Sequence, residues 1–181
     1  KGARQDGHRY ISDAYNKGVR CFVLAAEEDL PTDISAHFIQ VSDPLESLQA
    51  LATHHRQQFE LPVIGITGSN GKTIVKEWLF QLLNDNLQIV RSPESYNSQI
   101  GVPLSVWQIQ AHHQLGIFEA GISRREEMKR LQPIIDCRIG VLTHMSGAHD
   151  EGFTDQQEKI KEKLDLFKSA GVIIYGGDDA T

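Results

Sequence analysis

The sequence predicts an α/β protein: a parallel β-sheet with helices on both faces and a phosphate-binding loop (P-loop), preceded by a small α/β domain. Two observations carry this prediction. From residue 63 onward, short apolar runs alternate with segments whose apolar residues recur at helical spacing, the pattern of a parallel sheet and its connecting helices. In addition, a glycine-rich stretch over residues 65–73 joins the first of these strands to the first helix.

The expected elements follow from this periodicity. In the first domain we expect a helix over 9–18, strands over 21–25 and 37–41, and a helix that begins at Asp43. Asp43 as N-cap, Pro44 in the first turn and Glu46 as partner form a capping box. Further strands are expected over 63–67, 88–90, 115–119, 138–143 and 172–175, and further helices over 72–84, 102–109, 124–131 and 155–169. The domains are predicted to span 1–60 and 61–181, with the boundary at Glu60-Leu61-Pro62.

The glycine-rich stretch predicts a nucleotide site. In such a loop the backbone N–H groups turn toward a phosphate, and the N-terminus of the next helix adds positive potential. Lys72 would reach the β- and γ-phosphates, and the Thr73 hydroxyl would bind Mg²⁺. The glycines recur at every third residue, and Ile66 takes the place where kinases and GTPases have glycine, so a different subtype of loop is indicated. The loop residues expected at the nucleotide are Gly68, Ser69, Asn70, Gly71, Lys72 and Thr73.

Polar residues also follow the other predicted strands. The apolar strand over 115–119 ends in Glu119, a carboxylate of the kind that Mg²⁺ prefers. A polar turn with Asn97 follows the second strand, and residues 143–150, with His149, follow the fourth. A lone Glu or His at a strand end is more often structural than catalytic. The carboxyl ends of parallel strands share one edge, however, so together these residues indicate a nucleotide–metal site.

Composition narrows the possible partners. The 181 residues suffice for one large or two small domains, and 18 basic against 24 acidic residues without a basic stripe argue against nucleic acid. No apolar run is long enough to cross a membrane and no signal peptide is evident, so we expect a cytoplasmic protein. Cys21 and Cys137 are expected to be buried free thiols. Because the chain starts at Lys1, without Met, we expect a fragment of a longer protein.

The motifs and the order in which they occur along the chain resemble those of the Mur ligase family. These are the ATP-dependent amide-bond-forming enzymes of peptidoglycan precursor synthesis. The motifs that carry the resemblance are Thr67–Thr73, Asn97 with Ile100–Pro103, Glu119–Gly121, Gly147–His149 and Lys163 with its neighbours Leu164 and Asp165. Within the family the chain is most similar to the MurF type, which adds D-alanyl-D-alanine to UDP-N-acetylmuramoyl-tripeptide; Asp6-Gly7-His8 resembles the N-terminal domain of that type. The sequence departs from the family pattern at Ser98, His144, Leu164 and Asp165, which affects details of the adenine and metal contacts.

The resemblance implies a mechanism and a role for each residue. ATP would phosphorylate the terminal carboxylate of the UDP-sugar peptide, and the amine of D-alanyl-D-alanine would attack the acyl phosphate. Lys72 would hold phosphates, Thr73 and Glu119 one Mg²⁺, and His149 a second Mg²⁺, while Asn97 would lie at the nucleotide. Lys163 would be carbamylated by CO₂ to give an anion. Residues 1–60 would be part of the UDP-sugar-binding domain, residues 61–181 part of the ATP-binding domain, and the isolated chain is expected to be inactive.

Several alternatives stay open. The chain could belong to another Mur ligase or to a relative of folylpolyglutamate synthetase, although the folate enzymes lack such an N-terminal unit. It could also be a nucleotide-binding module without ligase activity. The joint presence of all the motif residues argues against this alternative. Locally, Lys159, Lys161 and Lys163 lie on a charged helix and could all be solvated. Only the spacing from His149 distinguishes Lys163 from its neighbours.

Overall fold

A computed structural model describes residues 6–26, 31, 33–145 and 156–177. The chain divides into two compact units, Lys1–Ser47 and Leu48–Thr181. This division lies earlier than the boundary predicted at residue 60, because most of helix α2 (Pro44–Arg56) belongs to the second unit. Gln49 donates to the side chain of Gln99 at 2.9 Å, and Arg56 binds backbone carbonyls of the second unit. Because of these contacts, α2 from Leu48 onward is part of the second unit.

The first unit is a short helix beside two parallel strands. It begins with the 3₁₀ turn η1 (Gly7–Tyr10), which continues into α1 (Ile11–Asn16), and strand β1 (Cys21–Ala25) pairs with β2 (His37–Val41). Both strands match the predicted ranges. The prediction that Cys21 is buried was wrong: Cys21 is exposed, because strand alternation places it on the same face as the exposed Val23, opposite the buried Leu24.

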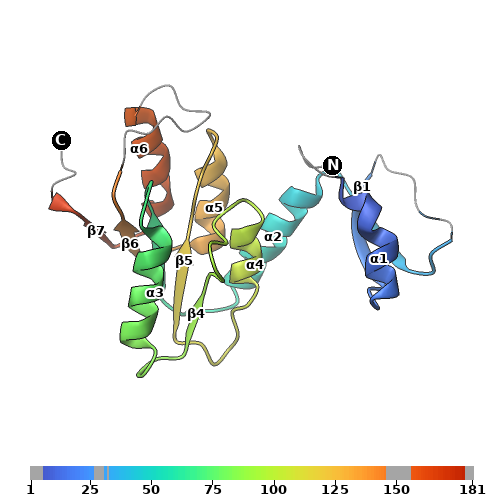
Figure 1. Cartoon of the computed structure of the whole chain (residues 1–181), viewed down its shortest axis with the longest axis horizontal. Coiled ribbons are helices and arrows are strands. Elements are labelled where there is room, and N and C mark those ends of the chain that lie inside the picture. Colours follow the sequence, from blue (N-terminus) through green and yellow to red (C-terminus); the bar gives the residue numbers. More distant parts are fainter. Residues whose placement is uncertain (1–5, 27–30, 32, 146–155, 178–181) are drawn as a thin grey trace. The chain divides into compact units, whose positions relative to one another are not determined.

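The second unit contains a five-stranded parallel sheet in the order β4-β5-β3-β6-β7 (Figure 1). Its strands are β3 (Val63–Thr67), β4 (Ile89–Arg91), β5 (Leu115–Glu119), β6 (Ile139–Leu142) and β7 (Val172–Tyr175). Three of them match the predicted ranges, and β4 and β6 differ from theirs by one residue at each end. The predicted α/β fold with a parallel sheet is therefore confirmed.

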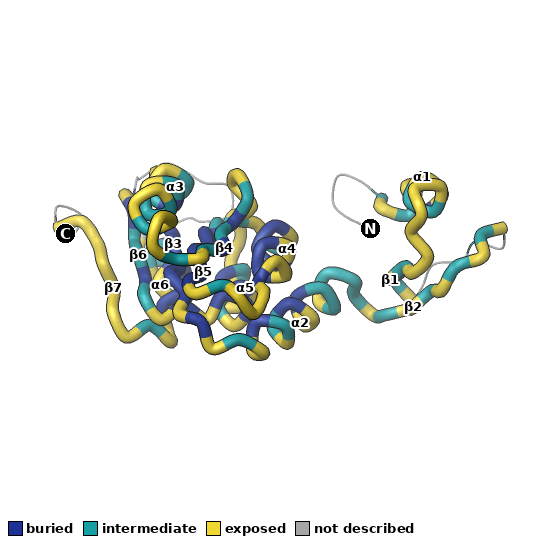
Figure 2. The backbone as a smooth tube through the Cα atoms, turned by 90° about the horizontal axis from the view of Figure 1, so that it is seen from below, coloured by how far each residue is buried: buried dark blue, intermediate teal, exposed yellow. Residues whose placement is uncertain are grey.

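Helices cover both faces of this sheet, and strand alternation divides the core into two clusters. Helix α3 (Lys72–Leu83) packs Val75 and Leu79 on one face, against Ile66 and its neighbours. The other face, with Phe118, is covered by α2 and by α4 (Gly101–Val106), α5 (Glu127–Ile135), α6 (Gln156–Leu164) and the 3₁₀ turn η2 (Asp165–Phe167). Strands β3 and β5 are buried along their whole length, as Figure 2 shows.

Helix α5 lies further along the chain than the predicted 124–131. The Glu127 carboxylate accepts the amides of Ser123 (2.7 Å) and Arg124 (3.0 Å), which forms a turn before the helix starts. At the other end the helix continues past Pro133 and stops at Asp136, whose φ is 41°. Proline in a helix interior removes a backbone hydrogen bond, but packing of Ile134 and Ile135 in the core keeps these residues helical.

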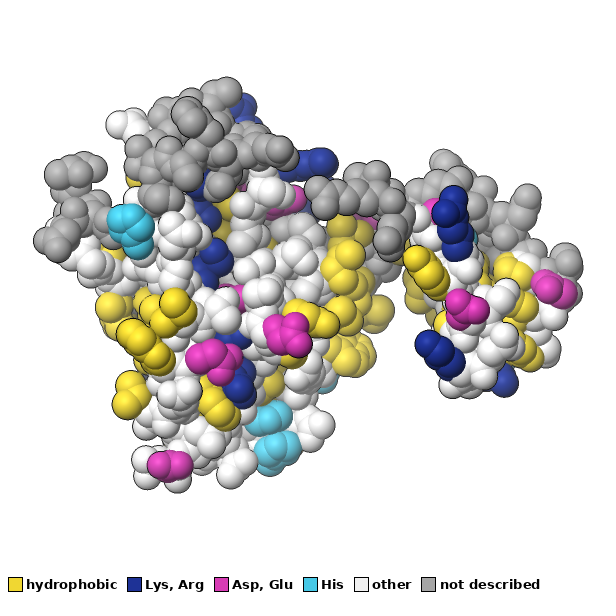
Figure 3. All heavy atoms as spheres, in the orientation of Figure 1, with side chains coloured by type: hydrophobic (Ala, Val, Ile, Leu, Met, Phe, Trp, Pro, Cys, Tyr) yellow, Lys and Arg dark blue, Asp and Glu magenta, His cyan; other side chains and the backbone are white. Residues whose placement is uncertain are grey.

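Apolar side chains are also exposed on the outer side of α3, where Ile74, Trp78 and Leu82 form a stripe over three turns (Figure 3). The side chains of β7 are exposed as well. No helix in the described parts of the chain is long and apolar enough to span a membrane.

Candidate functional site at the phosphate loop

The loop between β3 and α3 has a backbone shape that requires glycine at two positions. Gly71 has a φ of 86° and is the N-cap residue of α3. Gly68 has a φ of 150°, and a Cβ atom there would collide with the Thr143 side chain. Any other residue would strain the backbone at either position and, at Gly68, would also displace Thr143, which directly follows β6. The glycine pattern thus reflects a built loop, not a flexible linker.

Hydrogen bonds to the ends of β5 and β6 fix the loop in place. The Thr67 hydroxyl donates to the Ala120 carbonyl at 2.9 Å, and the amides of Ser69 and Asn70 donate to the His144 carbonyl at 3.0 and 3.3 Å. The Ser69 hydroxyl is buried and has no hydrogen-bond partner in the described parts of the chain. Such an orphaned polar atom in a phosphate loop is a donor suited to a bound anion.

Two lysine ammonium groups converge on this loop. Lys72 Nζ donates to the carbonyls of Gly68 (2.9 Å) and Ser69 (3.3 Å), and Lys163 Nζ donates to the same Gly68 carbonyl at 3.1 Å. Both ammonium groups therefore lie beside one carbonyl oxygen of the loop. The arrangement favours an anionic ligand.

Helix α6 presents its lysines to two different environments. Lys163 is 2% exposed and Lys159 is 3% exposed, whereas Lys161 is exposed. The alternative in which all three are solvated is therefore wrong. Only Lys161 fits that description, and the four-residue spacing of Lys159 and Lys163 places both on the buried side of α6.

A buried carboxylate faces the start of α3. Glu119 is fully buried at the end of β5, and its oxygens accept hydrogen bonds from the Thr73 hydroxyl (3.0 and 3.3 Å) and from Asn97 Nδ2 (3.2 Å). Both partners are neutral. A buried carboxylate with neutral partners carries a large desolvation cost that a bound cation would offset.

The donor atoms at this place suit a hard cation. A hydroxyl from Thr73 and a carboxylate from Glu119 are oxygen ligands, and Mg²⁺ typically combines one or two such groups with waters and phosphate oxygens. Within the described ranges there is no cluster of three His, Cys, Asp or Glu side chains that would hold a metal without a phosphate. His149, the predicted ligand of a second Mg²⁺, lies outside the described residues, so its role stays a prediction.

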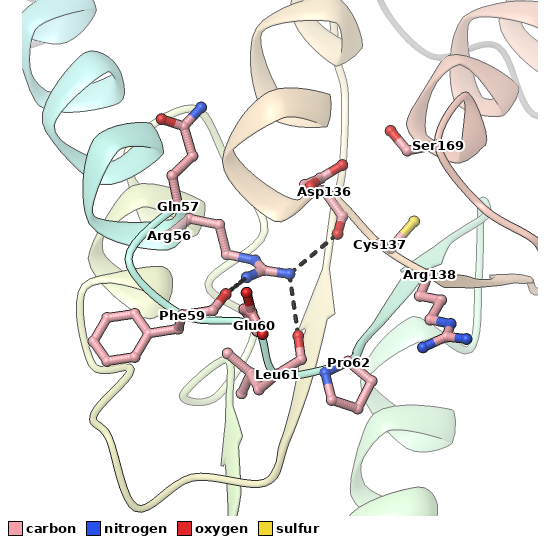
Figure 4. A pocket seen from close by; sticks show the side chains of 10 residues that line it. All are labelled: Arg56, Gln57, Phe59, Glu60, Leu61, Pro62, Asp136, Cys137, Arg138 and Ser169. Atoms are coloured by element: carbon pink, nitrogen blue, oxygen red, sulfur yellow. Dashed lines mark hydrogen bonds between the residues drawn. The ribbon is translucent and has the colours of Figure 1, made fainter.

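A cavity of about 470 Å³ lies where the chain enters β3 and β6, at the end of these strands away from the phosphate loop (Figure 4). Its walls include Arg56, whose guanidinium donates to four backbone carbonyls: Phe59 (2.7 Å), Ile135 (3.2 Å), Leu61 (3.3 Å) and Asp136 (3.3 Å). Burial lowers the pKa of Arg56, partly countered by Asp136. The guanidinium thus joins the segment between α2 and β3 to the end of α5. Because these backbone contacts occupy Arg56, we place the candidate functional site at the phosphate loop and not at this cavity.

The fold and the site geometry can now be compared with known proteins. The family model described as the Mur ligase middle domain matches residues 66–181. The chain belongs to the Mur ligase family. The family resemblance seen in the sequence is thereby confirmed.

Among curated Mur ligases, the chain is 34% identical to the UDP-N-acetylmuramoyl-tripeptide–D-alanyl-D-alanine ligase of Treponema pallidum, covering 92% of this chain and 38% of that protein. It is 30% identical to the Bacillus subtilis enzyme of the same name, covering 99% and 40%. The chain thus spans about two fifths of the length of these relatives.

Solved structures of MurF proteins have the same fold as this chain. MurF of Acinetobacter baumannii superposes with a TM-score of 0.84 at 25% identity, covering 97% of this chain and 39% of that one. MurF of Thermotoga maritima, solved in complex with ADP, gives a TM-score of 0.84 at 27% identity, covering 99% and 42%.

Sequence reasoning missed two residues that lie next to Glu119 in this candidate site, Lys76 and Ser92. Lys76 is fully buried, and its ammonium donates to the Ser92 carbonyl at 2.8 Å. The Ser92 hydroxyl in turn accepts the Glu119 amide at 3.2 Å. The one signal in the sequence was position: Lys76 lies one helical turn after Lys72 and so on a neighbouring part of the same face.

Proposed function

We propose that this chain is the nucleotide-binding part, with a portion of the substrate-binding part, of an ATP-dependent ligase that adds D-alanyl-D-alanine to UDP-N-acetylmuramoyl-tripeptide. The observation that carries the proposal is the convergence of Lys72 and Lys163 on the Gly68 carbonyl, beside the Thr73–Glu119 pair. The names of the curated relatives and the ADP complex of the Thermotoga maritima protein support it.

The residues present fit ATP and Mg²⁺. Lys72 and the loop from Gly68 to Thr73 would hold the phosphates, and the Thr73 hydroxyl and the Glu119 carboxylate would hold Mg²⁺. Bound Mg²⁺ would neutralise charge on the transferring phosphoryl group. The protein's contribution is to position the phosphates and to exclude water around the buried Glu119. Asn97 would orient that carboxylate at the edge of the nucleotide site.

Lys163 has a specific role in this proposal. Its buried ammonium lies at the phosphate loop, where it donates to the carbonyl that Lys72 also binds. Reaction of the deprotonated Lys163 amine with CO₂ forms an N–C bond and releases a proton, and the resulting carbamate is an anion. That anion would attract Lys72 and support a metal ion.

The first unit would contribute to binding the UDP-sugar peptide. It contains the Asp6-Gly7-His8 motif, in which Asp6 accepts hydrogen bonds from the amide (3.1 Å) and Nδ1 (2.6 Å) of His8. We therefore assign it to the substrate-binding domain. ATP and UDP-linked sugars are cytoplasmic metabolites, and we place the reaction in the cytoplasm.

A ligase assay on the full-length protein tests the proposal. UDP-muramoyl-tripeptide with D-alanyl-D-alanine, UDP-muramoyl-dipeptide with an amino acid, and a folate with glutamate are offered side by side, with ATP and Mg²⁺. We expect product and ADP release with the first pair. Preference for another pair would replace the substrate assignment, and nucleotide binding without any ligation would leave a binding module.

A further inference from the structure

We infer that Lys76 is a positioning residue for the Glu119 carboxylate and acts through the turn formed by residues 92–97. The inference rests on the proposed function in one respect, namely that Glu119 binds Mg²⁺. It concerns a residue outside the phosphate loop, on the second turn of α3.

The Lys76 ammonium is fully buried and its three donors have three acceptors. It donates to the Ser92 carbonyl (2.8 Å) and to the Glu94 carbonyl, and it pairs with the Glu77 carboxylate at 3.2 Å. Two of these three acceptors are backbone atoms of one turn. A fully buried cation bound to two backbone carbonyls fixes the path of the chain there far more strongly than a surface ion pair would.

The turn that Lys76 holds is conformationally unfavourable. Glu94 has a φ of 44°, in the left-handed region that residues with a Cβ rarely adopt, and its side chain is exposed. The side chain therefore offers no packing to offset the backbone cost. The Lys76 ammonium compensates by binding the carbonyl of the same residue.

Both ends of this turn contact Glu119 or its neighbours. The Ser92 hydroxyl accepts the backbone amide of Glu119 at 3.2 Å, and Asn97 Nδ2 donates to the Glu119 carboxylate at 3.2 Å. The Asn97 carbonyl also accepts the Gly121 amide at 2.7 Å. The distance between Ser92 and Asn97 is set by the turn, so Lys76 fixes the backbone and the carboxylate of Glu119 together.

The charges around Lys76 are balanced within the same group of residues. Glu77 also pairs with Arg91 at 3.1 Å, and Arg91 lies 3.5 Å above the ring of Phe80. The hydrogen bond from Arg91 is the main cause that lowers the pKa of Glu77, with a smaller contribution from Lys76. If Lys76 were purely structural, its replacement would lower the stability of the protein alone. If Lys76 positions Glu119, its replacement also raises the Mg²⁺ requirement.

The test compares Lys76→Met with wild type in the full-length protein. We expect the Mg²⁺ concentration for half-maximal turnover to rise about tenfold or more, as for other partners of metal-binding groups. Affinity for ADP without Mg²⁺ should be unchanged, because Lys72 and the loop remain. Lys129→Met, an exposed lysine paired with Glu126, is the matched control. A lower melting temperature with an unchanged Mg²⁺ requirement would overturn the inference.

Two further variants test the route. Adding Glu94→Gly to Lys76→Met should partly restore the wild-type Mg²⁺ requirement. Glycine adopts the left-handed conformation without needing the Lys76 ammonium to hold its carbonyl. Ser92→Ala, which keeps the carbonyl that Lys76 binds, should also raise the Mg²⁺ requirement and covers the case in which Lys76→Met does not fold. No change in Ser92→Ala would count against the inference. If Glu119→Gln itself leaves the Mg²⁺ requirement unchanged, the proposed metal site fails instead.

Discussion

At the residue scale, the second unit is unusual in burying charged side chains at one edge of its sheet. Glu119 is fully buried beside neutral partners, and Lys163 is 2% exposed at the loop carbonyl. Charged groups are rarely buried unless paired, because their desolvation is costly. Under the proposed function a bound nucleotide and Mg²⁺ would supply the compensating charges, and the predictions for single residues depend on this balance.

Lys72→Ala is expected to weaken ATP binding about 100-fold, the effect of removing a charged hydrogen-bond partner from a phosphate. Calorimetric titration of the full-length protein with ATP measures the change. Lys129→Ala, an exposed lysine on α5, serves as control. Unchanged affinity in Lys72→Ala would remove the assignment of the loop to phosphate binding.

Glu119→Gln is expected to raise the Mg²⁺ requirement for turnover about tenfold or more while leaving the melting temperature nearly unchanged. Glutamine keeps the size of the side chain and one acceptor oxygen for Asn97, and its NH₂ group can donate to the Thr73 hydroxyl, but the negative charge is lost. Turnover measured across a Mg²⁺ series, with Glu126→Gln at an exposed position as control, gives the result. Normal activity at limiting Mg²⁺ would show that Glu119 is structural.

At the element scale, the orientation of α6 decides which lysine acts. Lys163→Ala is expected to inactivate the full-length ligase, and acetate or formate should partly restore activity by replacing the carbamate in the vacated space. Lys161→Ala should behave as wild type, because Lys161 is exposed. Turnover with increasing carboxylate concentration is the measurement. Equal loss in both variants, or no rescue at any concentration, would contradict the carbamate.

The junction of α2, β3 and α5 depends on Arg56. Arg56→Met leaves four carbonyls without their donor and is expected to lower the free energy of unfolding by about 3 kcal/mol. Urea unfolding of the chain, followed by tryptophan fluorescence, reports on this unit because Trp78 and Trp107 both lie in it. Arg125→Met, at an exposed ion pair with Glu158, should change stability by less than about 1 kcal/mol. Equal effects of the two substitutions would refute this account.

At the scale of the whole molecule, the phosphate loop, Thr73, Glu119 and Lys163 all lie in the second unit, while the chain spans about two fifths of its relatives. Residues 1–181 are therefore expected to bind ADP but not to form the amide bond, since relatives of this kind are longer. Equilibrium binding of ADP and a ligase assay on residues 1–181 test both statements. Detectable ligation would show that the described units suffice for the reaction.

The sequence alone determined the parallel sheet, the glycine loop and the carboxylate at the end of β5. These features are local: apolar runs predict strands, glycine positions predict the turn, and a polar residue that ends an apolar run predicts a group at the sheet edge. The ranges of β3 and β5 match the structure for this reason.

Only the tertiary structure decided which polar groups are buried and what they touch. The charge pattern of α6 does not separate Lys161 from Lys163, and the contact of Lys163 with the Gly68 carbonyl shows which of the two is buried at the loop. In the sequence Lys76 looks like any lysine of a helix, and only the structure shows that it binds the carbonyls of the turn over 92–97. The division at Ser47 likewise follows from contacts of α2 with later segments. Such contacts join residues far apart in the chain, and no local pattern encodes them.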